Sequence, residues 1–254
     1  ALATVLSQMV GAVWILHFLT GKKTILKLKP SCLRLEGPVI LPCLGLGVST
    51  FVMLSTESLL SITFTASLAR YGGDLAVGAM TIITSVSQLV MLPLQGVCQG
   101  GQPIISYNYG AGHGDRVKKT FYLVFSVCMT YTVLFWATVL LFPSVFAGIF
   151  TTNAELSGYT SWALRIYMAG IFACGAQCSC QQSFMALGQA KVSLLLACLR
   201  KIVLLIPLIL ILPHVLPFDP VFSVFLAEPV SDIAAAVITT ITFLTRFNRI
   251  LEMR

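Results

Sequence analysis

Long apolar runs alternate along this chain with short polar or basic stretches. Each run approaches the roughly 20 residues that a helix, rising about 1.5 Å per residue, needs to cross a 30 Å hydrocarbon core. The runs are apolar on all sides and do not alternate with a period of two, which argues against a lipid-facing β-barrel. They lie at residues 2–19, 39–66, 75–98, 121–142, 162–187, 192–212 and 221–244. The pattern predicts an all-α, polytopic membrane bundle of about seven transmembrane helices.

Composition agrees with a membrane protein. Of the 254 residues, 57% are hydrophobic and only 10% are charged, whereas soluble domains carry about 25% charged residues. The net charge of +7 comes from Lys and Arg that punctuate the apolar runs, so we expect membrane lipids as partners and no nucleic acid. Most of the eight cysteines fall in or at the ends of apolar runs, where a thiol acts as a small hydrophobe and a disulfide is not expected.

The residues give no pattern for an enzyme, a resident metal or a cofactor. The three histidines lie near loops, outside any HExxH or GxSxG motif. Cys174, Cys178 and Cys180 cluster, but they have no nearby His or acid to complete a zinc site. We therefore expect neither catalysis nor a bound metal.

Basic residues set the expected orientation. If the stretch after the first run is cytoplasmic, only Arg70 and Arg165 lie on the opposite side. The cytoplasmic side then receives Lys22, Lys23, Lys27, Lys29, Arg34, Arg116, Lys118, Lys119, Lys191, Arg246, Arg249 and Arg254. This imbalance predicts a cytoplasmic carboxy terminus. The first residues, ALATVLSQ, have no charged leader and read as the middle of a longer chain.

The stretch GVCQGGQPIISYNYGAGHGDRVKK, residues 96–119, joins two apolar runs. Gly100, Gly101 and Pro103 are expected to end the third helix at the membrane interface, and the cations that follow begin the fourth among the headgroups. From QGGQPI onward the stretch resembles the signature that follows the second helix of each half in multidrug and toxic compound extrusion (MATE) transporters. LARYGG, SFMALGQAK and AEPVSDIAAAV also fall in that family's order, so the resemblance covers essentially the whole chain.

The resemblance implies a domain organisation. MATE transporters have twelve helices in two six-helix lobes, so residues 1–20 match the last helix of an amino-terminal lobe. Residues 21–37 form a basic amphipathic cytoplasmic linker, and residues 38–254 form the six-helix carboxy-terminal lobe. We expect about five more membrane helices before Ala1, and the first run to pack loosely because its own lobe is missing.

The resemblance also implies a function. The chain is expected to be part of a secondary active transporter that exports drugs or other organic cations by antiport with protons or sodium ions. Two alternatives stay open. A lipid-linked saccharide flippase of the same superfamily would differ in a more cationic cavity, and an incomplete half-transporter would have no independent activity, because alternating access needs two bundles.

Glu57 is the first candidate for coupling. Carboxylates inside a membrane usually face a cavity or a partner. Glu57 lies within an apolar run among serines and a threonine, and it matches an acidic MATE position that takes part in cation coupling. We expect its side chain to face the lobe interior near the midplane. A structural Glu hydrogen-bonded to nearby hydroxyls is the alternative.

A second acidic pair lies in the last run. Glu228 and Asp232 are four residues apart on one helix face, separated by Pro229. Counted from opposite ends of neighbouring helices, Asp232 reaches the depth of Arg200 and Lys201. A buried ion pair that joins two helices is favoured, and a second cation site is the alternative. The fifth run lacks the acid that some sodium-coupled members carry there, which leaves the coupling ion open.

Candidate substrate contacts combine amide and adaptable apolar side chains. Gln177 and Gln181 can hydrogen-bond a drug, and Met53 and Phe172 can line an apolar cavity. Helix packing or lipid contact is the competing interpretation for all four.

Overall fold

The computed structural model describes residues 2–21 and 37–252 of the chain, although several side chains within these ranges fall outside the description. Every regular element among these residues is a helix. Contacts divide the chain into two compact units, Ala1–Ser49 and Thr50–Arg254. Helix α1 (Leu2–Thr20) corresponds to the first predicted run and belongs to the smaller unit. The domain boundaries and the loose packing of the first run stay predictions, and the linker at 21–37 lies almost wholly outside the described residues.

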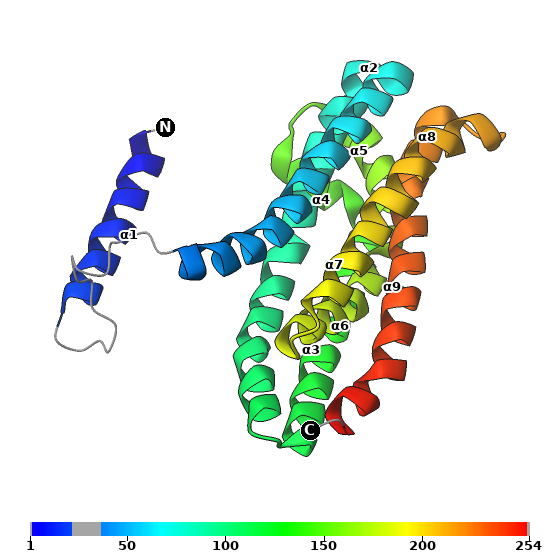
Figure 1. Ribbon diagram of the computed structural model, residues 1–254. Helices are drawn as coiled ribbons and strands as arrows, with labels where there is room; N and C mark the ends of the chain where they lie inside the picture. Colours follow the sequence, from blue (N-terminus) through cyan, green and yellow to red (C-terminus); the bar gives the residue numbers. More distant parts are fainter. Residues whose placement is uncertain (1, 22–36, 253–254) are drawn as a thin grey trace. The chain divides into compact units, whose positions relative to one another are not determined.

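Helix α2 (Gly37–Gly110) holds two predicted runs in two arms. The arms meet at Gly73, whose φ of 63° and ψ of −160° break the helical path. A positive φ costs glycine nothing because it has no Cβ, so the chain turns back at this point. Residues 61 and 65 of the first arm line the same hollow as residues 77–85 of the second, and Figure 1 shows the arms running in opposite directions.

The predicted helix end at Gly100 to Pro103 is wrong. Helix α2 continues to Gly110, and α3 (Gly114–Leu141) starts after a short turn. Gly101 permits close helix contact, because a Cβ there would lie 2.6 Å from Cγ2 of Val124 on α3. Pro103 removes a backbone donor and crowds the preceding turn, yet α2 continues through it to Gly110. The glycine pair therefore marks a close helix contact and leaves the helix unbroken.

After α3 the chain forms several short helical segments and then one long helix, α9. Short α4 (Pro143–Phe150) follows α3. The fifth predicted run divides into α5 (Ala154–Tyr167), the 3₁₀ segment η2 (Met168–Ala173) and α6 (Cys174–Ala186). The sixth becomes α7 (Ala190–Cys198), the π-helical segment η3 (Leu199–Leu205) and α8 (Ile206–Val215). The seventh is α9 (Pro220–Glu252).

Helix α9 organises the larger unit, since it packs against α5, η2, α6, η3 and α8. Two apolar clusters form the core. One surrounds η2 and includes Phe64 and Phe225, and the other joins α3, α6 and α9. In the second cluster the Phe121 and Phe243 rings lie 4.5 Å apart between centroids, so aromatic packing holds the ends of α3 and α9 together.

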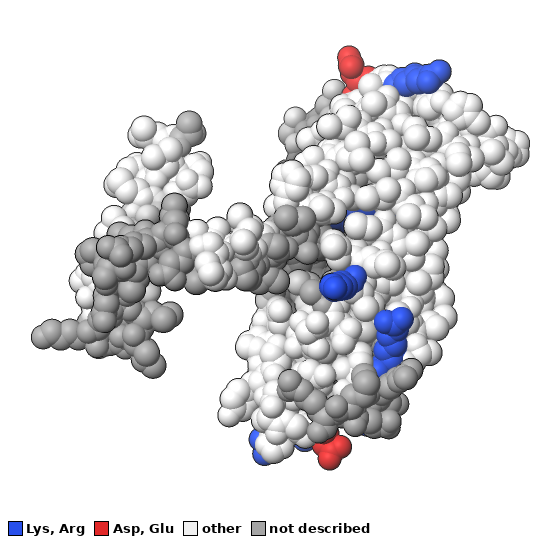
Figure 2. Space-filling view, in the orientation of Figure 1, with Lys and Arg blue, Asp and Glu red and all other residues white. Residues whose placement is uncertain are grey.

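The structure confirms the all-α membrane fold. Five described stretches are long and apolar enough to cross a membrane: Leu2–Thr20, Leu54–Gly110, Gly114–Leu141, Lys191–Val215 and Pro220–Phe247. The 57 residues of Leu54–Gly110 include both arms of α2. The fifth predicted run is not among the five stretches, because η2 divides it into helices too short to cross a membrane. Figure 2 shows one face of the molecule, on which the charged side chains of the larger unit lie mainly at its two ends, with a few basic ones between them.

Candidate cation and substrate site

Arg200 lies at the centre of a buried charge cluster. Its Nη2 is 3.2 Å from Oε1 of Glu228, and the same nitrogen contacts Oδ1 of Asp232. The three side chains are 16%, 9% and 3% exposed respectively, so they are largely removed from solvent. η3 supplies the guanidinium and α9 supplies both carboxylates, which face it from positions four residues apart. The structure thus brings together three of the residues singled out in the sequence.

The backbone around this cluster is irregular in three neighbouring elements. Arg200 lies in a π-helical turn, a form often found at functional sites. Pro229 separates the two acids and removes a backbone donor within α9. Gly170 of η2 lies against Pro229, since a Cβ on Gly170 would come within 2.7 Å of the Pro229 Cα. The cluster is therefore held where a 3₁₀ segment, a π segment and a proline-interrupted helix meet.

Some polar atoms of the cluster lack a hydrogen-bond partner. The Cys174 thiol donates to Oδ2 of Asp232 at 3.5 Å, which joins α6 to α9. Among the described residues, Nε of Arg200 and Oε2 of Glu228 are buried and have no hydrogen-bond partner. A buried polar atom without a partner costs about 1–3 kcal/mol. The second Glu228 oxygen is thus available to a proton, a water molecule or a cation.

Lys201 and Glu57 form a second ion pair beside the first. The Lys201 ammonium contacts Oε1 of Glu57, and this contact joins η3 to the first arm of α2. The Glu57 side chain is 57% exposed in the described chain while its partner Lys201 is 15% exposed, and the interior, midplane position of Glu57 stays a prediction. The buried neighbour is Thr56, whose hydroxyl donates to the Val52 carbonyl oxygen at 2.7 Å. The rotation of the helix therefore directs the hydroxyl inward and the carboxylate toward Lys201.

The two pairs form one unbalanced set of charges. Three acids, Glu57, Glu228 and Asp232, face two bases, Arg200 and Lys201. With all five groups ionised the formal sum is 2 − 3 = −1. An unbalanced charge at membrane depth is costly, so the set favours uptake of one positive charge. It has the chemistry to bind a proton or a monovalent cation.

A hydroxyl-lined hollow of about 290 Å³ opens between the two arms of α2. Thr81, Thr84 and Ser85 line it from the second arm, and each donates its proton to the carbonyl oxygen four residues earlier, at 2.8–3.1 Å. Ser61 and Thr65 line it from the first arm, one and two turns beyond Glu57. Because the three donors are used internally, their oxygen lone pairs face the hollow as acceptors. Phe64, Val77 and Met80 complete the lining, so the hollow suits an apolar molecule that carries a hydrogen-bond donor or a positive charge.

Sequence reasoning missed this hollow. Its signal was the repeat of hydroxyl residues at spacings of three and four in both arms. That repeat becomes a shared lining only because Gly73 folds one arm onto the other.

The predicted substrate contacts Gln177, Gln181 and Phe172 do not line the hydroxyl-lined hollow. Gln181 donates from Nε2 to the Ser193 carbonyl oxygen at 3.5 Å and thereby joins α6 to α7. The Phe172 ring packs against Trp136 with centroids 5.6 Å apart. Gln177 is buried, and its Oε1 has no hydrogen-bond partner among the described residues. The Met53 side chain lies outside the described part. Gln181 and Phe172 thus take part in packing between helices, and a role in substrate binding stays a prediction for all four residues.

Comparison with known proteins finds relatives called multidrug export proteins. The chain is 24% identical over 246 residues to a protein of Staphylococcus saprophyticus called "Multidrug export protein MepA", and 22% identical over 245 residues to one of the same name from Staphylococcus aureus. Each match covers 94% of this chain and 52% of the relative, so the chain spans about half the length of the curated relatives it matches.

Solved structures share the fold. The "Crystal structure of MATE in the bent conformation" superposes with a TM-score of 0.87 at 17% identity, over 100% of this chain and 56% of that one. A transporter of the MOP superfamily from Pyrococcus furiosus gives 0.85 at 17% identity, over 98% and 56%. The family profile described as MatE matches residues 49–211, more than half of the chain, and confirms the resemblance seen in the sequence: the chain belongs to the MatE family.

Proposed function

We propose that this chain is the carboxy-terminal part of a secondary transporter that exports small organic cations in exchange for protons or sodium ions. The observation that carries the proposal is the unbalanced charge set formed by Glu57, Lys201, Arg200, Glu228 and Asp232 in an otherwise apolar bundle. The MatE membership and relatives called multidrug export proteins support it. No catalytic chemistry forms part of it.

In this proposal Lys201 competes with the coupling ion for Glu57. When a proton or sodium ion neutralises Glu57, Lys201 loses its partner, and the contact between η3 and the first arm of α2 weakens. That contact lies next to the hydroxyl hollow in sequence and space, because Ser61 is one turn from Glu57. Ion binding is thereby linked to the shape of the substrate hollow, as exchange of two ligands requires.

The charge set provides for one coupling ion per cycle, because it holds a formal excess of one acid. Exchange of one monovalent ion for one singly charged organic cation moves no net charge across the membrane, so the concentration gradient of the coupling ion supplies the energy. The described residues favour neither a proton nor a sodium ion, because the unpaired Glu228 oxygen can accept a proton or ligate a metal cation.

The flippase alternative finds less support in the charge set. A pyrophosphate-linked substrate needs excess positive charge, whereas both cations of the set contact carboxylates and acceptor oxygens line the hollow. A cationic substrate fits this environment. We further propose that the chain works in a bacterial plasma membrane with its carboxy terminus in the cytoplasm, together with an amino-terminal lobe.

The test is cation-driven efflux. The longest reading frame that contains this chain is expressed in a bacterial strain without its own multidrug exporters, and efflux of the fluorescent cation ethidium is followed. Efflux should stop when the driving gradient is dissipated, by nigericin for protons or monensin for sodium ions. Absence of gradient-dependent efflux, with the protein present in the membrane, would reject the function. Residues 1–254 expressed alone should not transport, which tests the half-transporter alternative.

Glu57→Gln is the variant for the coupling role. It keeps size and hydrogen bonding but removes the negative charge, so efflux should fall about 5- to 150-fold, the factor that a coupling energy of 1–3 kcal/mol implies. The matched control is Glu155→Gln, at an exposed acid in the first turn of α5. Equal efflux by Glu57→Gln and the parent at matched abundance would make Glu57 a structural residue.

A further inference from the structure

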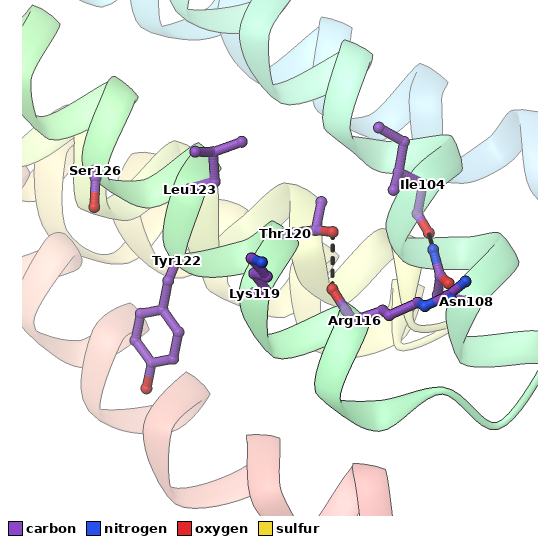
Figure 3. A pocket seen from close by; sticks show the side chains of 8 residues that line it. All are labelled: Ile104, Asn108, Arg116, Lys119, Thr120, Tyr122, Leu123 and Ser126. Carbon is purple, nitrogen blue, oxygen red and sulfur yellow. Dashed lines mark hydrogen bonds between the residues drawn. The ribbon is translucent and has the colours of Figure 1, made fainter.

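A second hollow, of about 560 Å³, opens at the opposite end of the second arm of α2 from Gly73. Ile104 and Asn108 line it from α2, and the rest of the lining comes from the first turns of α3 (Figure 3). These α3 residues are Arg116, Lys119, Thr120, Tyr122, Leu123 and Ser126. Most recur at spacings of three or four, so they share one face of the helix. The proposed transport site does not include this face.

The hollow changes character along α3. Arg116, Lys119 and Thr120 lie within the first two turns, and Leu123 lies about one turn further on. The candidate membrane span of α3 begins at Gly114, so the two cations lie where a span meets the headgroups. Leu123, further into this span, is 67% exposed. A basic end and an exposed apolar wall thus share one hollow.

Asp115 lies in the same first turn of α3 but forms no ion pair with the two cations of the hollow. Among the described residues, neither Arg116 nor Lys119 lies in an ion pair, and both side chains are exposed. Figure 3 shows the Arg116 side chain reaching toward Asn108. An arginine fork binds phosphate oxygens in pairs, and a lysine adds a point charge beside it. Their unneutralised charge attracts an anion and disfavours a cationic drug.

Two polar side chains of the hollow present acceptors. Asn108 is buried, and its Nδ2 donates to the Ile104 carbonyl oxygen at 2.8 Å, which leaves its Oδ1 as an acceptor. The Thr120 hydroxyl donates to the Arg116 carbonyl oxygen at 2.8 Å, which leaves its lone pairs. Acceptors beside cations suit a phosphate group that also carries hydroxyl donors. The exposed apolar wall suits an acyl chain.

We propose that this hollow binds the headgroup of an anionic phospholipid with a hydroxyl-bearing headgroup, of the phosphatidylglycerol class. The phosphate lies between Arg116 and Lys119, the headgroup hydroxyls donate to Asn108 and Thr120, and an acyl chain follows Leu123. A zwitterionic lipid gains less, because its ammonium group meets two cations. The site ties the hairpin of α2 and α3 to the membrane surface independently of transport.

Native mass spectrometry of the purified chain tests the site. The chain is released from mixed micelles that contain equal amounts of dioleoyl phosphatidylglycerol and dioleoyl phosphatidylcholine, and the retained lipids are counted. The parent should retain phosphatidylglycerol preferentially. Each basic side chain near an anionic surface is worth about a fivefold preference, so Arg116→Gln/Lys119→Gln should lower the preference about 25-fold. Both residues are exposed, so the substitutions leave the packed core intact.

Lys191→Gln/Arg246→Gln is the matched control, because it removes two exposed cations from the same predicted side of the membrane. It should retain the preference of the parent. An equal loss in both double variants would overturn the site in favour of general surface charge, and no loss in Arg116→Gln/Lys119→Gln would overturn it directly. Displacement of the lipid by millimolar glycerol phosphate would identify a soluble phosphate as the ligand and overturn the lipid assignment.

Discussion

Replacing Arg200 by methionine isolates the energetic role of the buried charge cluster. Methionine is a flexible apolar side chain of similar length, so Arg200→Met removes the charge while filling much of the space. Glu228 and Asp232 then face each other without their shared cation, in surroundings where they are 9% and 3% exposed. The α9 carboxylates lose the contact that joins them to η3.

The expected cost follows from this burial. Removing one partner of a buried ion pair costs about 3–5 kcal/mol, because the remaining charge stays without compensation. For a chain of 150–250 residues, 1 kcal/mol shifts the melting temperature by about 2–4 °C. Arg200→Met should therefore lower the melting temperature by roughly 6–20 °C. The matched control, Arg165→Met, replaces an exposed cation on α5 and should cost less than about 0.5 kcal/mol.

Thermal unfolding of the purified protein in one detergent, followed by intrinsic fluorescence, measures both effects. A triple variant, Arg200→Met/Glu228→Gln/Asp232→Asn, removes the uncompensated charges together and should recover most of the lost stability. It should nevertheless fail to transport, because it removes the unpaired Glu228 oxygen and the excess negative charge of the set, although Glu57 and Lys201 remain. The reasoning is refuted if Arg200→Met melts within 2 °C or so of the parent, or if the triple variant melts as low as the single one.

Two further predictions concern close helix contacts. Gly170→Ala places a methyl group 2.7 Å from the Pro229 Cα, so η2 and α9 must move apart. The overpacking should cost about 1–3 kcal/mol and lower the melting temperature by several degrees. The control Gly148→Ala, with open space around it, should melt no lower than the parent, and an equal fall in both variants would contradict the packing argument. Gly101→Ala meets Val124 at 2.6 Å and should destabilise similarly, while addition of Val124→Ala should restore much of the loss. Additive losses in the double variant would show that the two residues do not compete for the same space.

Hydrophobicity along the chain was sufficient to predict the fold class. The length of an apolar run is a local property that translates directly into a membrane-spanning helix, because lipid leaves the backbone no partners except its own. The sequence also identified Arg200, Glu228 and Asp232, since a charge within an apolar run requires a partner. Their depth could be counted from the chain at a fixed rise per residue.

Only the tertiary structure decided which partner each charge takes and which way each side chain points. Arg200 and Lys201 are adjacent in sequence, but successive side chains of a helix point about 100° apart, and packing brings one to α9 and the other to Glu57 on α2. In the sequence Gly101 predicts the end of a helix, whereas in the structure it lies within α2 and its lack of a Cβ lets Val124 approach closely. These outcomes depend on the rotation of each helix about its axis and on its neighbours, and both are set by packing between segments far apart in the sequence.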